Sequence, residues 1–286
     1  MPQPSIELPF VPPYEREKAL ALIAAHAVPG AERVDLDDYS VTRVITAPSG
    51  PVAARVELGE ASVTVTISSA DPHDIDAVAS IVRLWFDLDL EPASILDAFG
   101  RDPRIGPLVA ARPGLRVIGH PDGYEAALTT VLGQQVSLAS ARTFAGRLVA
   151  AFGEPGPDSL MLFPRPAVLA SVPLDEVQRA IGLTGARTRT VHAVAQASAD
   201  GLILAPTSEP VATRAALLAI PGVGPWTADY LAVRALGDRD AYPAGDLVLR
   251  RALGVRTPAE AERLAEPWRP LRAYALLHIW TAAAFS

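Results

Sequence analysis

Asp246, Trp226 and Tyr230 are the side chains whose types and positions are best suited to chemistry. Asp246 precedes the helix-compatible run Leu247–Arg251, and the partial positive charge at a helix N-terminus helps to keep a carboxylate ionised. Such a carboxylate can stabilise positive charge that develops in a transition state, or activate a water molecule. The position is equally good for an N-cap aspartate, so both roles stay open at this point.

Trp226 and Tyr230 are four residues apart, so in a helix they share one face. The face of an aromatic ring attracts a cation with about 0.5–2 kcal/mol, which would make this pair suitable for a positively charged ligand. Packing in the protein core is the alternative, and it is the commoner fate of a single large aromatic residue.

A glycine hairpin precedes these aromatic residues. A helix-compatible run from Glu209 ends at Ile220 because Pro221 cannot continue it, and Pro225 is suited to the first turn of the next helix. Gly222 and Gly224 between them supply positive φ angles and close backbone approach. We expect a hairpin over about 209–237 whose outward N–H groups can bind one phosphate, or else a simple turn between two helices. A dinucleotide or P-loop site is disfavoured because the third glycine, the Gly-Lys-Ser/Thr and the preceding strand are lacking.

The composition limits the possible functions further. The chain has 286 residues, 50% of them hydrophobic and 20% charged, which is typical of a globular protein. It has no cysteine, which excludes disulfides, cysteine-ligated zinc and iron–sulfur clusters, and its five histidines are far apart. The N-terminus lacks the features of a signal peptide and no apolar run reaches the length of a membrane span, so we expect a cytoplasmic protein with no membrane partner.

The charge is distributed unevenly between two parts of different architecture. The net charge is −7, yet residues 1–100 carry 16 acidic and 6 basic side chains, whereas residues 101–286 carry 16 acidic and 19 basic ones. Nucleic-acid binding by the second part is therefore permitted. We expect an α+β protein with an N-terminal antiparallel β-sheet domain and covering helices over 1–98, followed by an all-α core over 99–286.

Local patterns define the expected elements. In the first part, helices are expected over about 14–28 and 74–86, and alternating β-branched residues predict strands over 40–45, 52–58 and 61–68. From Asp97 onward only helices and turns are expected. Asp122 and Glu125 have the spacing of a capping box at the start of a helix through Leu132, and residues 133–137 form a loop before the next helix.

Together these motifs resemble the bacterial 3-methyladenine DNA glycosylase II family, within the helix-hairpin-helix superfamily. The resemblance rests on the hairpin, the segment 242–246, the segment 123–137, the C-terminal run 268–280 and Pro12-Pro13-Tyr14, in this order and spacing. It covers essentially the whole chain. It implies a monofunctional DNA glycosylase of base excision repair that flips alkylated purines, such as 3-methyladenine and 7-methylguanine, out of duplex DNA and hydrolyses the N-glycosidic bond.

The resemblance also implies roles for individual residues. Asp246 is the catalytic carboxylate, and the base pocket is formed by Trp226, Tyr230, Trp280 and Gln134. The DNA contacts are Gln135, as the side chain that fills the gap in the base stack, and the hairpin residues Gly222, Val223, Gly224 and Thr227. The sequence departs from the family at Gln135, where enterobacterial relatives have leucine, and at Thr281, where some relatives have an aromatic residue.

No cofactor is expected, although the resemblance implies a structural monovalent cation on the main-chain carbonyls of Leu218, Ile220 and Val223. Trp226 occupies the position at which lyase-competent relatives carry a lysine, and Lys18 is the only lysine of the chain. We therefore expect an intact abasic site as product, duplex DNA with alkylated bases as partner, and a monomer. A non-catalytic damaged-DNA-binding protein, or a glycosylase for another lesion such as hypoxanthine or a bulky adduct, remain alternatives. We expect the helical glycosylase core to have a cleft between helical layers.

Overall fold

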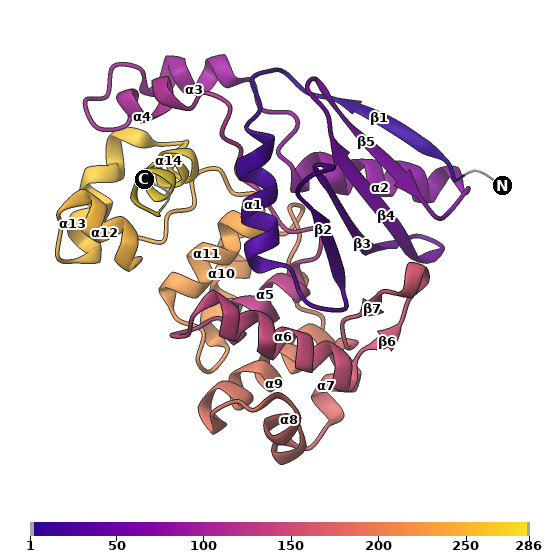
Figure 1. The fold of residues 1–286 in the computed structure, drawn as a ribbon. Coiled ribbons are helices and arrows are strands. Elements are labelled where there is room, and N and C mark those ends of the chain that lie inside the picture. The colour runs from indigo at the N-terminus through magenta and orange to yellow at the C-terminus, as the bar shows by residue number, and fades with distance from the viewer. Residues whose placement is uncertain (1–2, 285–286) are drawn as a thin grey trace.

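Five antiparallel strands form the N-terminal sheet in the spatial order β1-β5-β4-β3-β2 (Figure 1). The computed structural model describes residues 3–284. The strands are β1 (Ser5–Pro9), β2 (Glu32–Asp35), β3 (Ser40–Ala47), β4 (Gly50–Leu58) and β5 (Ser62–Ile67). The α+β fold class and the three predicted strands are confirmed. The two additional strands, β1 and β2, lie at the sheet edges, where short segments pair on one side only and need little apolar alternation.

Two helices accompany this sheet. Helix α2 (Pro72–Trp85) packs Val78, Val82 and Trp85 into the core beside the buried side chains of β3, β4 and β5. Helix α1 (Arg16–His26) buries Leu20 and Ile23 and lies between the sheet and the helical part of the molecule (Figure 1). This position brings one face of α1 to the site described below.

The rest of the chain is mostly helical, and its core is larger than that of the sheet. The helices are α3 (Pro92–Phe99), α4 (Gly106–Ala111), α5 (Gly123–Leu132), α6 (Leu138–Phe152), α7 (Pro166–Ser171), α8 (Leu174–Ile181), α9 (Gly185–Ala199), α10 (Pro210–Ala219), α11 (Pro225–Arg234), α12 (Leu247–Leu253), α13 (Pro258–Ala265) and α14 (Arg272–Ala284), with short 3-10 turns at Pro157–Ser159 and Glu266–Trp268. None of the helices in residues 3–284 combines the length and the apolar character needed to cross a bilayer.

The expectation of helices and turns alone after Asp97 was wrong in one place. A two-stranded ribbon, β6 (Glu154–Pro155) and β7 (Met161–Leu162), projects from the end of α6 toward the sheet. The amide of Met161 donates to the carbonyl of Gly30 at 2.8 Å, which ties the ribbon to the N-terminal part. Such short strands form because of this tertiary contact, and their own sequence gives no strand signal.

Helix α5 begins as predicted in one respect and differently in another. Asp122 accepts the amide of Glu125 at 3.0 Å and is the N-cap. The Glu125 carboxylate does not complete a capping box, however, because it forms an ion pair with Arg43 of β3. The guanidinium of Arg43 also binds Glu32 at 2.6 Å, and the Arg43 side chain is 3% exposed. This buried network joins the sheet to the helical part.

Candidate active site

The glycine hairpin connects α10 to α11 as the sequence predicts, but the expected positive φ at Gly224 was wrong, because Gly224 is the extended N-cap of α11 with a φ of −99°. Gly222 has a φ of +89°, and a Cβ built there would lie 2.0 Å from Oγ1 of Thr190 on α9. Only glycine is compatible with both constraints. The amide of Val223 donates to the carbonyl of Ile220 at 3.0 Å, and Pro225 opens α11. The local sequence therefore fixes the turn, and packing on α9 holds it.

Several hairpin amides have no backbone hydrogen-bond acceptor within residues 3–284. Among the residues described, the amides of Gly222, Gly224, Trp226 and Thr227 donate no backbone–backbone hydrogen bond, and the first such bond of α11 runs from Ala228 to Gly224. A Cβ at Gly224 would meet nothing within 4 Å. These amides are suited to an anion at the helix N-terminus. Val223 and Thr227 are buried, at 7% and 3% exposure, whereas Gly222 is exposed and Gly224 is half-buried.

The loop after α5 lies against this hairpin. The side-chain amide of Gln134 donates to the Gly222 carbonyl and to Oγ1 of Thr227, both at 3.2 Å. Gln134 is therefore engaged with the hairpin and is not among the residues that line the cavity described next. Its neighbour Gln135 is exposed and has a φ of +56°, which presents this residue at the tip of the loop.

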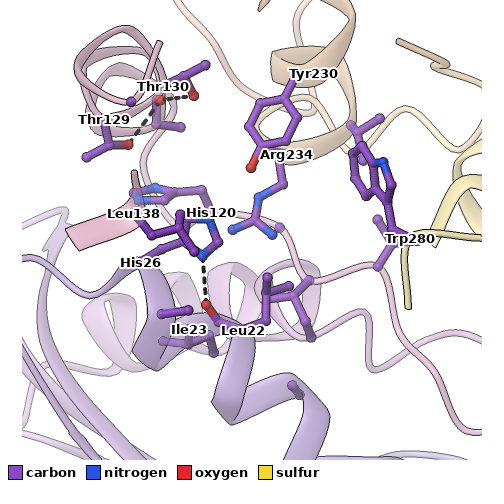
Figure 2. A pocket seen from close by; sticks show the side chains of 18 of the residues that line it. Leu22, Ile23, His26, His120, Thr129, Thr130, Leu138, Tyr230, Arg234 and Trp280 are labelled. Carbon is purple, nitrogen blue, oxygen red and sulfur yellow. Dashed lines mark hydrogen bonds between the residues drawn. The ribbon is translucent and has the colours of Figure 1, made fainter. Parts of the chain in front are cut away.

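Three aromatic side chains form one wall of a cavity of about 500 Å³. Trp226 and Tyr230 stack with ring centroids 5.2 Å apart and an interplanar angle of 15°, as their spacing predicts. Trp280 of α14 lies 6.2 Å from Tyr230, and Figure 2 shows both rings at the same cavity. The rings are half-buried, so their faces remain accessible from the cavity.

Asp246 lies at the edge of this wall and receives three hydrogen bonds. Its Oδ1 accepts the amide of Leu249 at 2.8 Å, which confirms the predicted N-cap of α12. The indole N–H of Trp226 donates to Oδ2 and that of Trp280 donates to Oδ1, both at 3.0 Å. The two tryptophans thus hold the carboxylate in one orientation, with no cation paired to it among the described residues.

The opposite wall belongs in part to the N-terminal region, which contributes helix α1 to the cleft. Leu22 and His26 of α1 line it, together with His120 from the connector before α5 (Figure 2). Arg234 follows Tyr230 by one helical turn and extends between the aromatic wall and the histidines. The cavity is therefore aromatic on one side and polar on the other.

The two histidines are electrically neutral near pH 7. Burial, reinforced by the nearby charges of Arg43 and Arg234, lowers the pKa of His120 well below its ordinary value. Desolvation in the cavity, together with Arg234, also lowers the pKa of His26. The polar wall consequently offers neutral imidazoles beside one guanidinium.

The described residues contain no group of three or more His, Cys, Asp or Glu side chains placed to hold a metal ion. The main-chain carbonyls expected to hold a monovalent cation are those of Leu218, Ile220 and Val223, which lie at the end of α10 and in the turn. That of Ile220 accepts the amide of Val223, and those of Leu218 and Val223 accept no backbone–backbone hydrogen bond in the part of the chain described.

Comparison with known proteins assigns a class to this fold and site. A family model described as the AlkA N-terminal domain matches residues 5–122, and one described as HhH-GPD superfamily base excision DNA repair protein matches residues 128–270. The solved 3-methyladenine DNA-glycosylase from Archaeoglobus fulgidus has the same fold, with a TM-score of 0.84, 18% identity and 98% of each chain covered. The fold is thus that of the helix-hairpin-helix base excision repair proteins.

Sequence relatives narrow this class to one family. DNA-3-methyladenine glycosylase 2 of Escherichia coli K12 is 32% identical over 279 residues, which are 96% of this chain and 95% of that protein. The probable bifunctional transcriptional activator/DNA repair enzyme AlkA of Mycobacterium tuberculosis H37Rv is 37% identical over 97% of this chain, which spans 56% of that longer protein. The chain belongs to the AlkA family of DNA-3-methyladenine glycosylases.

Sequence reasoning missed the polar wall of the cavity. Arg234 could have been found, because it is four residues after Tyr230 and so shares its helix face. His26 and His120 carry no such signal, because nothing near them in the sequence points to Tyr230. They reach the site only through the packing of α1 and of the connector against the helical core.

Proposed function

We propose that this chain is a DNA glycosylase that releases alkylated purines of the 3-methyladenine and 7-methylguanine type from duplex DNA. The observation that carries the proposal is Asp246, an acid held by two indole N–H groups beside a cavity with an aromatic wall. The family relationship supports it. A carboxylate fixed next to an aromatic cavity is suited to a cationic base and a cationic transition state.

Binding would begin at the hairpin. The free amides of Gly222 and Gly224 would hold a phosphate without reading the base sequence. Flipping the damaged nucleotide costs a few kcal/mol and leaves a gap in the duplex. Gln135, at the exposed loop tip, would fill this gap, and the base would enter the cavity beside Trp226 and Tyr230.

Cleavage would then proceed with the carboxylate of Asp246 near the sugar. The C1′–N bond breaks, its electron pair neutralises the positively charged base, and the sugar gains oxocarbenium character that Asp246 stabilises. A water oxygen then bonds to C1′ and releases a proton, so the products are a free base and an abasic site. Because the two indole donors and the Leu249 amide fix the carboxylate, little reorganisation is needed as the charge develops.

We propose that strand cleavage does not follow. Trp226 occupies the position from which a lysine would attack the sugar. Lys18 nevertheless lines the same large cavity, so its location in the N-terminal part does not by itself keep it away from the sugar. Borohydride treatment during turnover should trap no covalent complex. A trapped complex that disappears in Lys18→Arg would refute monofunctional chemistry and identify the amine.

We also propose that the hairpin binds a monovalent cation. The carbonyls of Leu218, Ile220 and Val223 would hold it, and two of them are free of backbone hydrogen bonds in the described residues. It would stiffen the turn that binds phosphate and take no part in bond cleavage. Replacing potassium by a bulky organic cation at constant ionic strength should then weaken duplex binding without changing the excision rate of bound DNA.

The test of the main proposal is base release. Duplex DNA methylated by an alkylating agent is incubated with excess protein, and the released bases are separated by chromatography. We expect 3-methyladenine and 7-methylguanine in the soluble fraction, with the strands left intact at neutral pH. Tight binding to the same DNA without base release would favour the non-catalytic damaged-DNA-binding alternative.

A further inference from the structure

The polar wall of the cavity contains few groups that are free to contact a ligand. The hydroxyl of Thr129 donates to the Glu125 carbonyl at 2.9 Å, and that of Thr130 donates to the Ala126 carbonyl at 2.6 Å. Both hydroxyl protons are thus used within α5. His26, His120 and Arg234 remain as the polar side chains that surround the space beneath Tyr230 (Figure 2).

The hydrogen bonds of the two histidines define opposite roles. Nδ1 of His120 accepts the amide of Asp122 at 3.1 Å, so a neutral ring carries its proton on Nε2 and offers a donor. Nδ1 of His26 lies 2.8 Å from the Leu22 carbonyl, which can only accept, so a neutral ring leaves Nε2 of His26 as an acceptor. Neither Nε2 has a hydrogen-bond partner within the described part of the chain. One imidazole therefore donates and the other accepts.

Arg234 adds a second donor at the same place. Its guanidinium makes no hydrogen bond or ion pair within residues 3–284, whereas Arg43, which also reaches the cavity, is occupied by Glu32 and Glu125. Arg234, His120 and His26 line the same cavity, and Figure 2 shows the Arg234 guanidinium beside the two imidazole rings. The polar wall thus presents two donors and one acceptor.

We propose that Arg234, His120 and His26 determine specificity by reading the lactam edge of a 6-oxopurine. This inference rests on the proposed glycosylase function and names the lesion class that the pocket favours. Carbonyl O6 would accept from Arg234 and His120, and N1–H would donate to Nε2 of His26. Guanine-type lesions, such as 7-methylguanine, present this edge.

A 6-aminopurine lesion presents the opposite pattern. The N6 amino group of 3-methyladenine would meet the two donors, and its N1 lone pair would meet the acceptor of His26. Unpaired polar groups in a desolvated pocket reduce binding strongly, so the mismatch discriminates between the two lesions. Both lesions are positively charged in DNA, so the charge of Arg234 affects them alike. The ratio of 7-methylguanine to 3-methyladenine release therefore reports on the hydrogen-bond pattern.

The experiment measures both bases released from one methylated duplex DNA under single-turnover conditions. Arg234→Met keeps the aliphatic stem and removes the donors, and His120→Phe removes the imidazole donor. We expect each change to lower the ratio of 7-methylguanine to 3-methyladenine release about tenfold or more. Arg165→Met is the matched control, because Arg165 is exposed, pairs with Glu154 and lies outside the cavity.

The possible outcomes are distinguishable. Equal slowing of both bases, or no change in either, would refute the specificity role. Arg234→Lys keeps the charge but not the planar donor fork, so it should lower the ratio of 7-methylguanine to 3-methyladenine release less than Arg234→Met does. If Arg234→Met fails to fold, an unchanged ratio in both Arg234→Lys and His120→Phe refutes the role. Failure of the wild-type protein to release either base would refute the proposed glycosylase function itself.

Discussion

Replacing Asp246 by asparagine separates a catalytic carboxylate from a helix cap. The asparagine side chain could keep the cap, because its oxygen can accept the Leu249 amide and the Trp280 indole N–H as Oδ1 of Asp246 does now. The amide nitrogen would replace Oδ2, which now accepts the Trp226 indole N–H at 3.0 Å. Two donors would then face each other, and one half-buried hydrogen bond would be lost.

The size of each effect follows from this geometry. The lost hydrogen bond and the unpaired donor should cost about 1–2 kcal/mol of unfolding free energy, equivalent to roughly 2–4 °C in Tm for each kcal/mol. Removing the negative charge from the transition state should slow excision about 100-fold or more, or about 2.7 kcal/mol of activation free energy. The kinetic effect therefore exceeds what a damaged cap explains.

The assay is single-turnover excision of 7-methylguanine beside a thermal melt. Asp229→Asn on α11 is the matched control, because Asp229 pairs with Arg214 at 2.7 Å and does not line the cavity. We expect the control to excise at the wild-type rate and the Asp246 variant to remain folded and to bind damaged DNA. Near-normal excision by the folded Asp246→Asn protein would remove this residue from the mechanism.

Three further predictions test the hairpin, the domain junction and the buried histidine. Gly224→Asp should weaken duplex binding on the order of tenfold, whereas Gly224→Ala in the same open space should not, by fluorescence anisotropy; equal binding of both variants would contradict the phosphate role. Arg43→Met should cost about 3–5 kcal/mol in urea unfolding because Glu32 and Glu125 lose their buried cation, against less than about 1 kcal/mol for the exposed Arg55→Met; similar losses would argue against the network. Burial lowers the pKa of His278 to about 4, so the unfolded chain takes up a proton first and stability falls as pH drops from about 6.5 to 4, by up to about 3 kcal/mol. His278→Phe should flatten this pH dependence of the urea midpoint, and an unchanged slope would assign it to other groups.

The fold class followed from the sequence because strand alternation and helix signals extend over many neighbouring residues. The edge strands β1 and β2 and the ribbon β6–β7 did not. Strand β1 pairs with β5, which is distant in the sequence, whereas β2 with 4 residues and β6 and β7 with 2 residues each are too short to show an alternating pattern. A distant partner also decides the role of Glu125, whose spacing predicted a capping box. Its carboxylate binds Arg43 instead, because a buried arginine requires an anion more than a helix end does.

In the site, the sequence by itself determined the hairpin turn, the cap at Asp246 and the common face of Trp226 and Tyr230. Each depends on φ preferences, capping or helical periodicity within a few residues. Only the tertiary structure decided that Trp280, 34 residues away, donates to Asp246, and that Gln134 reaches Gly222 across 88 residues. It also decided that His26 and His120 face Arg234 across one cavity. Such contacts arise when whole helices pack, and no local pattern encodes which side chains then meet.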